Sequence, residues 1–344
     1  MIRLLIVDDQ NVVRNVLSNA FQDDKYIEVV GTASNALDAK KIVPELRPDV
    51  ISLDVDMPGM SGLDFLDWLI PNYPCSVIML STYTETGAQV TLKALQKGAM
   101  DFVQKPDGTE EDFLRMLKEL SFKIKKLGTS PKPKYALTAF SGDKLKGPKS
   151  KLGFINLIAV GASTGGTQAI DFILNRLPNG LPPIVIVQHM PEHFTALFAN
   201  RLCQTSGLPV KEAAHGDILE EGFVYLAPGD KHMLVRRLAG KMYLEIESFD
   251  KVSGHRPSVD VMFNSIAKGG MAKNCLAILL TGMGRDGAIG LKNIKDAKGK
   301  TIAQDETSSV VYGMPKEAFL LGAVEKPMAL SRIPNEIVQI VETG

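Results

Sequence analysis

The stretch INLIAVGASTGGTQAI, residues 155–170, joins an apolar run to a turn of small residues and then to a segment with helical spacing. Such a run is typical of a strand that is buried on both faces of a parallel sheet. Similar runs follow at PPIVIVQHM (182–190) and CLAILLTGM (275–283). This alternation predicts a three-layer α/β/α domain with a mostly parallel sheet.

Two runs of alternating polarity lie between these strands, around residues 233–237 and 242–246. They are separated by Ala239-Gly240, so they predict an antiparallel hairpin added to the domain. The domain is expected to cover residues 153–344.

The N-terminal part of the chain repeats the same strand and helix alternation. Apolar runs occur five times, at residues 2–7, 27–30, 50–53, 77–80 and 102–103. They predict a five-stranded, doubly wound, flavodoxin-like domain over residues 1–122. Residues 123–152 carry nine lysines and one acid, together with prolines and glycines, and are expected to form a basic linker.

Composition narrows the possible functions. The 344 residues contain 39 basic and 39 acidic side chains, and this balance gives no support to nucleic-acid binding. The chain contains no apolar run near the roughly 18 residues of a membrane span, and its start does not resemble a signal peptide. We therefore expect a cytoplasmic protein without membrane insertion. Its three separate cysteines, Cys75, Cys203 and Cys275, are expected to be buried or partly buried thiols.

Chemically active side chains gather at the strand ends of the first domain. Asp8 and Asp9 follow the first strand, and Asp54 ends the third. Three carboxylates at one edge would repel one another unless a cation such as Mg²⁺ lies among them. Asp54 could then accept a phosphoryl group, whose oxygens Ser81 and Lys105 could hold. Four further acids are taken as surface charge: Asp24, Asp38, Asp49 and Asp64.

In these features the first domain resembles the receiver domain of bacterial response regulators. The matching elements are the acidic pair, the stretch DVDMPGMSG (54–62), the hydroxyl at residue 81 and the Lys-Pro pair at 105–106. The resemblance implies that a histidine kinase is the phosphodonor and that Asp54 is the phosphoacceptor. It implies Mg²⁺ ligands at Asp8, Asp9, Asp54 and the backbone carbonyl of Asp56. It implies switch and phosphate contacts at Ser81, Phe102 and Lys105.

The stretch GASTGG (161–166) allows three interpretations. It approaches the dinucleotide pattern G-x-G-x-x-G, but Ser163 occupies the position at which a glycine lets a pyrophosphate approach. It also fits the nucleophile turn G-x-S-x-G, where the following helix amides would favour an oxyanion. The third interpretation is a tight turn without chemistry.

A nucleophilic serine needs a base and a group that orients the base. All five histidines lie in the second domain, and His189 is favoured because it ends a buried strand. His193 is expected to cap or cover, and surface positions are expected for His215, His232 and His255. Asp286 follows the last long strand, so it could orient the base, cap the next helix, or do both.

The second domain resembles the catalytic domain of the chemotaxis protein-glutamate methylesterases, the CheB family. The matching stretches are VGASTGGTQAI, VQHMPEHFT, YLAPGDKHM, GHRPSVDVMF and LLTGMGRDGA. The resemblance implies a serine hydrolase with a Ser163, His189 and Asp286 triad, and oxyanion donors at the Thr164 and Met283 amides. It implies hydrolysis of γ-glutamyl methyl esters and deamidation of glutamines on chemoreceptor cytoplasmic domains, without a cofactor for this chemistry. Phosphorylation at Asp54 would uncover the site.

Three other functions remain alternatives. A degenerate second domain could bind receptors without catalysis, and the intact Ser163, His189 and Asp286 argue against this. A nucleotide-dependent oxidoreductase would use GASTGG for its cofactor. DNA binding, common among proteins with receiver domains, would need a basic helical face that this sequence lacks.

Overall fold

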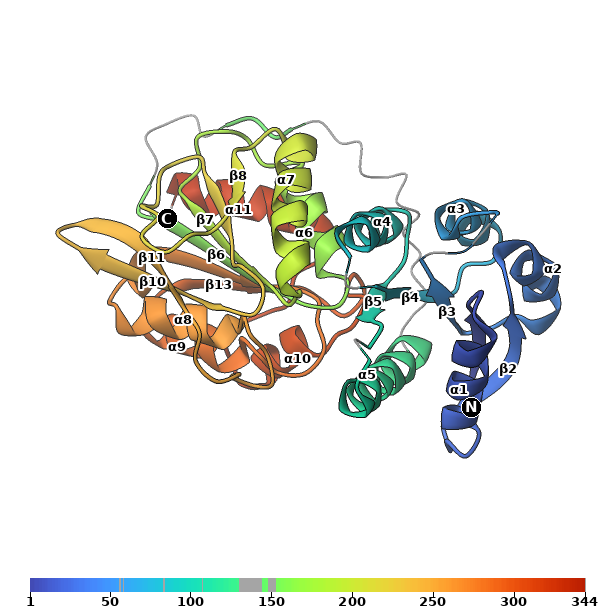
Figure 1. Cartoon of the computed structure of the whole chain (residues 1–344). Helices are drawn as coiled ribbons and strands as arrows, with labels where there is room; N and C mark the ends of the chain where they lie inside the picture. The colour runs from blue at the N-terminus through green and yellow to red at the C-terminus, as the bar shows by residue number, and fades with distance from the viewer. Residues whose placement is uncertain are drawn as a thin grey trace. The chain divides into compact units, whose positions relative to one another are not determined.

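The computed structural model describes residues 1–55, 57, 59–82, 84–106, 108–129, 144–147 and 153–343. The chain divides into two compact units, Met1–Ala139 and Phe140–Gly344. Each unit contains a parallel sheet of its own (Figure 1). No helix within the described ranges is long and apolar enough to cross a membrane.

The first unit contains a five-stranded sheet in the order β2-β1-β3-β4-β5, and all neighbouring strands are parallel. Helices α1 and α5 pack on one face, and α2, α3 and α4 form the layer on the other. The predicted doubly wound fold is confirmed. The strands are β1 (Ile2–Val7), β2 (Ile27–Ala33), β3 (Val50–Asp54), β4 (Ser76–Ser81) and β5 (Asp101–Gln104), and the helices are α1 (Asn11–Phe21), α2 (Ala36–Leu46), α3 (Gly62–Asn72), α4 (Glu85–Gln96) and α5 (Glu110–Thr129).

Helix α5 extends beyond the expected domain end near residue 122. It continues to Thr129 because Ile124 and Leu127 are buried against the unit's core. Lys123 also stays inside the helix, since its ammonium pairs with Asp101 and Glu119. The first seven residues of the expected linker are therefore helical. Apart from residues 144–147, residues 130–152 lie outside the described part of the chain.

The second unit contains a six-stranded sheet in the order β13-β12-β6-β7-β9-β8, again with parallel neighbours throughout. Helices α8, α9 and α10 form one layer, and α6, α7 and α11 form the other (Figure 1). The expected three layers are confirmed. The strands are β6 (Leu157–Ala162), β7 (Ile184–Gln188), β8 (Val210–Glu212), β9 (Val224–Leu226), β12 (Cys275–Leu279) and β13 (Lys300–Ala303), the helices are α6 (Gly166–Leu174), α7 (Glu192–Ser206), α8 (Val259–Lys268), α9 (Ala288–Asp296), α10 (Met314–Leu320) and α11 (Ile333–Thr343), and the short 3₁₀ helices are η2 (Ala272–Asn274) and η3 (Leu330–Arg332).

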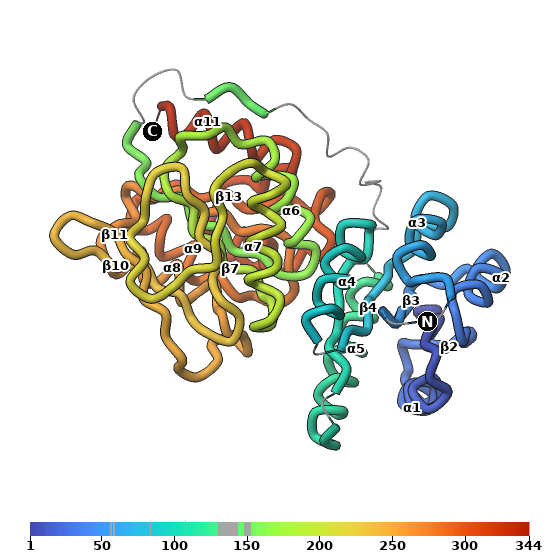
Figure 2. Tube along the Cα trace, turned by 45° about the horizontal axis from the view of Figure 1, so that its top comes forward, coloured from blue at the N-terminus to red at the C-terminus, as the bar shows by residue number. Residues whose placement is uncertain are grey.

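The predicted antiparallel hairpin is also confirmed, and it consists of β10 (His232–Leu238) and β11 (Lys241–Glu247). Ala239 and Gly240 close it with φ angles of +49° and +82°, as a two-residue hairpin turn requires. The hairpin projects from the body of the unit (Figure 2).

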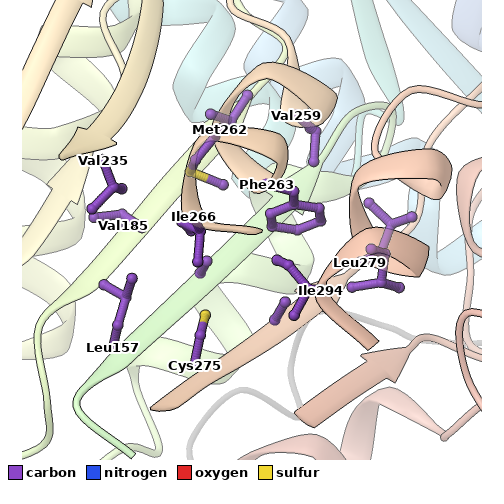
Figure 3. Packing of buried hydrophobic residues seen from close by; sticks show 14 of the residues in the cluster. Leu157, Val185, Val235, Val259, Met262, Phe263, Ile266, Cys275, Leu279 and Ile294 are labelled. Atoms are coloured by element: carbon purple, nitrogen blue, oxygen red, sulfur yellow. The ribbon is translucent and has the colours of Figure 1, made fainter. Parts of the chain in front are cut away.

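The core under α8 holds the second sheet against its helical layer. Met262, Phe263 and Ile266 point from α8 toward strand residues such as Val185 and Cys275 (Figure 3). All five side chains are fully buried. Cys75 is buried as well, but the expectation was wrong for Cys203, which is exposed on α7 because Leu202 takes the buried position in that turn.

Both sheets reverse their strand order at one point, and ligands of open α/β sheets bind outside the strand ends at such points. In the first unit the reversal lies between β1 and β3, so the residues that end or follow these strands, Asp8, Asp9 and Asp54, meet there. In the second unit it lies between β6 and β12, and the loops after these strands carry Ser163 and Asp286.

Candidate active site

Ser163 lies in the sharp turn between β6 and α6. Its N–H donates to the Thr281 carbonyl at 3.0 Å, and its own carbonyl accepts from the Gly166 N–H at 2.7 Å. Gly165 has a φ of +76° and begins α6 as its N-cap. A Cβ on Gly282 would lie 2.7 Å from the Ser163 Cβ, so the loop after β12 is pressed directly against this turn. The turn presents Ser163 where two loops meet.

His189 follows β7, the strand beside β6. Its N–H donates to the Ala162 carbonyl at 3.0 Å, which sets the ring next to the Ser163 turn. The Nε2 atom lies 2.8 Å from Asp286 Oδ2, and Nδ1 is buried without a hydrogen-bond partner among the described residues. When Nε2 carries the proton and donates it to the carboxylate, Nδ1 has a lone pair that can accept another proton. The ring is thus arranged as a base with one unoccupied nitrogen.

Asp286 is 1% exposed, and its side chain faces the N-terminus of α8 from the loop after β12. Its carboxylate accepts from the Ser258 hydroxyl at 2.7 Å, the Val259 N–H at 2.7 Å and the Asp260 N–H at 3.2 Å. Burial alone would raise the pKa of Asp286, but the hydrogen bonds from His189, Ser258 and Val259 lower it below its ordinary value. The carboxylate therefore stays ionised beside His189.

The suggestion that Asp286 caps the following helix is wrong. Gly287 is the N-cap residue of α9 and has no side chain, and the carboxylate that accepts from the first turn of α9 belongs to Asp260. Asp286 instead accepts two amides from the first turn of α8, where an anion is favoured by the helix dipole.

A second carboxylate lies close to Asp286. Asp260 is 5% exposed and accepts from the Gly290 N–H at 2.6 Å. Burial raises the pKa of Asp260 to about 6, and the nearby charge of Asp286 adds to this, against the opposing Gly290 hydrogen bond. Asp260 could not be identified from its local sequence, because its partner Gly290 is 30 residues away along the chain.

Gln188 ties the turn and the histidine together. Its Nε2 donates to the Ser163 carbonyl at 3.0 Å and to the His189 carbonyl at 3.2 Å. On the other side, the Thr281 hydroxyl donates to the Thr164 carbonyl at 2.9 Å. These bonds fix three loops to one another and so make the site rigid.

The two amides expected as oxyanion donors lie in the loops that meet at Ser163. Each loop is bound through the amide of the preceding residue, since Ser163 donates to the Thr281 carbonyl and Gly282 donates to the Val311 carbonyl, both at 3.0 Å. Thr164 and Met283 are next in each loop, and both side chains are largely buried.

The expectation of a surface position was wrong for His232, which is fully buried. Its Nδ1 lies 3.3 Å from the Ser258 amide, and its ring stacks on Phe249. His255 is half-buried, and its ring stacks on His189 with centroids 3.8 Å apart. His193 and His215 are exposed.

The first unit brings its acidic residues together at the ends of β1 and β3. One carboxylate oxygen each of Asp8, Asp9 and Asp54 lies within 4.8 Å of the other two. Asp9 Oδ1 is buried and has no hydrogen-bond partner in the ranges that the structure describes, so this oxygen fits a cation ligand. The three carboxylates are therefore a suitable donor set for Mg²⁺, and the carbonyl of Asp56 lies outside the described residues.

Lys105 joins this acidic cluster from the loop after β5. Its Nζ lies 2.9 Å from Asp8 Oδ2 and 2.9 Å from Asp54 Oδ1. Burial alone would lower the pKa of Lys105, but the two carboxylates outweigh it and raise the pKa. The ammonium thus remains charged next to Asp54.

Ser81 ends β4, the strand beside β3, and Phe102 is the second residue of β5, the next strand of the sheet. The Ser81 hydroxyl is fully buried and accepts from the Thr91 hydroxyl of α4 at 2.7 Å. Phe102 is 7% exposed, and the ammonium of Lys123 lies 5.6 Å from its ring centroid. Both side chains are held inward by neighbouring helices.

Comparisons with known proteins agree with both units. The family described as CheB methylesterase matches residues 158–337, and the response regulator receiver domain matches residues 4–118. A protein named protein-glutamate methylesterase/protein-glutamine glutaminase 4, from Anaeromyxobacter dehalogenans, is 44% identical over 98% of this chain and 95% of its own. A protein-glutamate methylesterase/protein-glutamine glutaminase from Sulfurimonas denitrificans is 44% identical over 99% of this chain and 98% of its own. The crystal structure of the Thermotoga maritima CheB methylesterase catalytic domain is similar, with a TM-score of 0.53 and 39% identity over 54% of this chain and 99% of that one.

Proposed function

This chain belongs to the CheB methylesterase family, and we propose that it hydrolyses γ-glutamyl methyl esters on the cytoplasmic domains of chemoreceptors. We propose that it also deamidates specific receptor glutamines, under the control of phosphorylation in its receiver domain. The observation that carries the proposal is the His189 ring beside the Ser163 turn. It is bound to buried Asp286 through Nε2, and Nδ1 has no partner in the described part of the chain.

The first half of the reaction is acyl transfer to Ser163. Its Oγ attacks the side-chain carbonyl carbon of the substrate while His189 Nδ1 takes the hydroxyl proton. The tetrahedral intermediate then collapses, and the same nitrogen gives the proton to the leaving group. Methanol leaves from an ester and ammonia from a glutamine, and an ester bond joins the substrate to Ser163.

The second half is hydrolysis of this acyl-enzyme. His189 Nδ1 takes a proton from water, whose oxygen attacks the carbonyl carbon. The proton then returns to Ser163 Oγ as that bond breaks, and a glutamate is released. Asp286 stabilises the imidazolium that forms in both halves, because its carboxylate is ionised and only 1% exposed.

The developing oxyanion requires hydrogen-bond donors near Ser163. We assign this role to the Thr164 and Met283 amides, which lie in the two loops that meet at Ser163. Removal of one such donor typically lowers kcat about 100-fold to 1,000-fold. We propose no cofactor for this half of the molecule, since these groups suffice for acyl transfer.

In the receiver domain we assign Asp54 as the phosphoacceptor for a chemotaxis histidine kinase. Asp8, Asp9 and Asp54, with the Asp56 carbonyl, would hold Mg²⁺, whose charge would offset that of the phosphoryl oxygens. Lys105 already contacts Asp54 and is placed to bind one of these oxygens. The Ser81 hydroxyl would exchange its hydrogen bond with Thr91 for one to the phosphoryl group, and the ring of Phe102 would then rotate.

Mass spectrometry of methylated receptor tests the activity directly. Incubation with the protein should convert methylated glutamates to glutamate and selected glutamines to glutamate. Neither product should form with Ser163→Ala. Conversion that persists in Ser163→Ala, or no conversion by the wild type, would contradict the proposal.

A further inference from the structure

Within the described part of the chain, one hydrogen bond holds the ring of His189 in position. Nε2 binds Asp286 at 2.8 Å, and Nδ1 on the other side has no partner among these residues. With one hydrogen bond at Nε2 and one covalent bond to Cβ, the ring can still rotate about the axis through Cβ and Nε2. A tilt would move Nδ1, so something else must set the plane of the ring.

The ring of His255 supplies the missing constraint. It lies parallel to the ring of His189, with centroids 3.8 Å apart and an interplanar angle of 9°. A face-to-face contact at this distance opposes any tilt, since tilting would press one edge of His189 into its neighbour. His255 also covers one face of His189, whose side chain is only 8% exposed.

His255 is itself anchored on both sides along the chain. Its backbone exchanges two hydrogen bonds with Val252, of 2.9 and 3.1 Å, which close the Ser253-Gly254 turn. The next residue, Arg256, binds the Asp230 carboxylate at 2.8 and 3.0 Å and the Phe249 carbonyl at 3.0 Å. The ring of His255 therefore belongs to a segment, residues 252–256, that these hydrogen bonds hold in place.

The same segment also holds the partner of His189. Ser258 and Val259, three and four residues after His255, donate to the carboxylate of Asp286. One short stretch of chain thus positions the base through a ring and the orienting carboxylate through hydrogen bonds.

From this arrangement we propose that His255 is a positioning residue, whose flat ring holds His189 in the plane that directs Nδ1 toward Ser163. The inference rests on the proposed function. It requires a planar side chain at residue 255, and it does not require an imidazole. A phenyl ring should therefore replace His255, whereas a branched aliphatic side chain of similar volume should not.

The test compares His255→Phe with His255→Leu in the full chain, with His215→Leu as a control at an exposed histidine. The first readout is the rate at which a small fluorophosphonate modifies Ser163, because this reaction needs His189 but no receptor docking. The second is kcat and KM for demethylation of receptor. Circular dichroism and the thermal midpoint report folding.

His255→Leu should lower both the labelling rate and kcat about tenfold or more, with KM unchanged within about twofold. His255→Phe should stay within about threefold of the wild type, as should His215→Leu. If His255→Leu does not fold, His255→Met, which also lacks a planar group, takes its place in the same comparison.

Three results would overturn the inference. Wild-type labelling in His255→Leu would show that the ring is not needed. Equal loss in the Phe and Leu variants would show that the imidazole itself is needed, and a change confined to KM would indicate a substrate contact. Failure of the proposed function is separate, because the wild type itself would then not demethylate receptor, while the labelling rates would still compare the variants at residue 255.

Discussion

Replacement of Ser258 by alanine should destabilise the catalytic domain more than the loss of an ordinary helix cap. The Ser258 hydroxyl is fully buried, donates to the ionised Asp286 carboxylate at 2.7 Å, and accepts from the Val261 N–H at 3.3 Å as the N-cap of α8. Loss of such a cap costs about 1 kcal/mol. Loss of a hydrogen bond to a charged group costs about 1.5–3 kcal/mol. Ser258→Ala should therefore lower the free energy of unfolding by about 2.5–4 kcal/mol.

The receiver domain offers a matched control. Ser61 is the N-cap of α3, accepts from the Asp64 N–H at 3.2 Å, and donates to the exposed Asp64 carboxylate at 2.8 Å. The two serines make the same pair of bonds, but only the partner of Ser258 is buried. Ser61→Ala should cost about 1 kcal/mol, since an exposed carboxylate regains its bond from water.

Urea unfolding of the full-length variants measures both costs. Trp68, the single tryptophan, lies in α3, so its fluorescence reports the receiver domain alone. Circular dichroism reports both domains, and the transition that tryptophan fluorescence does not follow belongs to the catalytic domain. A cost for Ser258→Ala no larger than that for Ser61→Ala would refute the view that Ser258 stabilises a buried charge.

Three more predictions follow from the two sites. Asp286→Asn should lower kcat about 10,000-fold with little change in KM, because the asparagine amide favours the wrong tautomer of His189. Methanol release measures both constants, and a loss in kcat below tenfold would contradict this prediction. Asp260→Asn should stabilise the fold by about 1–3 kcal/mol above pH 6 and not below pH 3.8, because the raised pKa of about 6 makes ionisation of Asp260 unfavourable in the folded state. Urea unfolding from pH 4 to 8 measures this gain, and a gain that does not change with pH would contradict the raised pKa. Removal of Mg²⁺ with EDTA should abolish the phosphorylation of Asp54 by acetyl phosphate, measured as intact mass, and full phosphorylation in EDTA would contradict the metal assignment.

Apolar runs and turn residues predicted most of the fold correctly. The buried strands were visible because both faces of each parallel strand are covered, as in β4 and β6, where every residue is buried. The hairpin was visible because Ala239-Gly240 separates two alternating runs. The end of α5 was missed because Lys123 and Lys125 in its last turns resemble linker residues, although Lys123 is bound to Asp101 and Glu119.

Only some residues of the candidate site could be predicted from the sequence. Residues at strand ends could be placed, because parallel strands bring their carboxyl ends to one edge. Residues that act through contacts distant along the chain could not. Ser258 binds Asp286 across 28 residues, and Gln188 binds Ser163 across 25. His255 was assigned to the surface, since nothing in its local sequence indicates the ring on which it stacks.

Methanol release from methylated chemoreceptor membranes tests the central claim, with and without acetyl phosphate and Mg²⁺. The comparison needs three full-length proteins, the wild type, Ser163→Ala and Asp54→Asn. The account predicts release by the wild type that acetyl phosphate stimulates, basal release without stimulation by Asp54→Asn, and none by Ser163→Ala. Release by Ser163→Ala, or equal stimulation of Asp54→Asn, would contradict it.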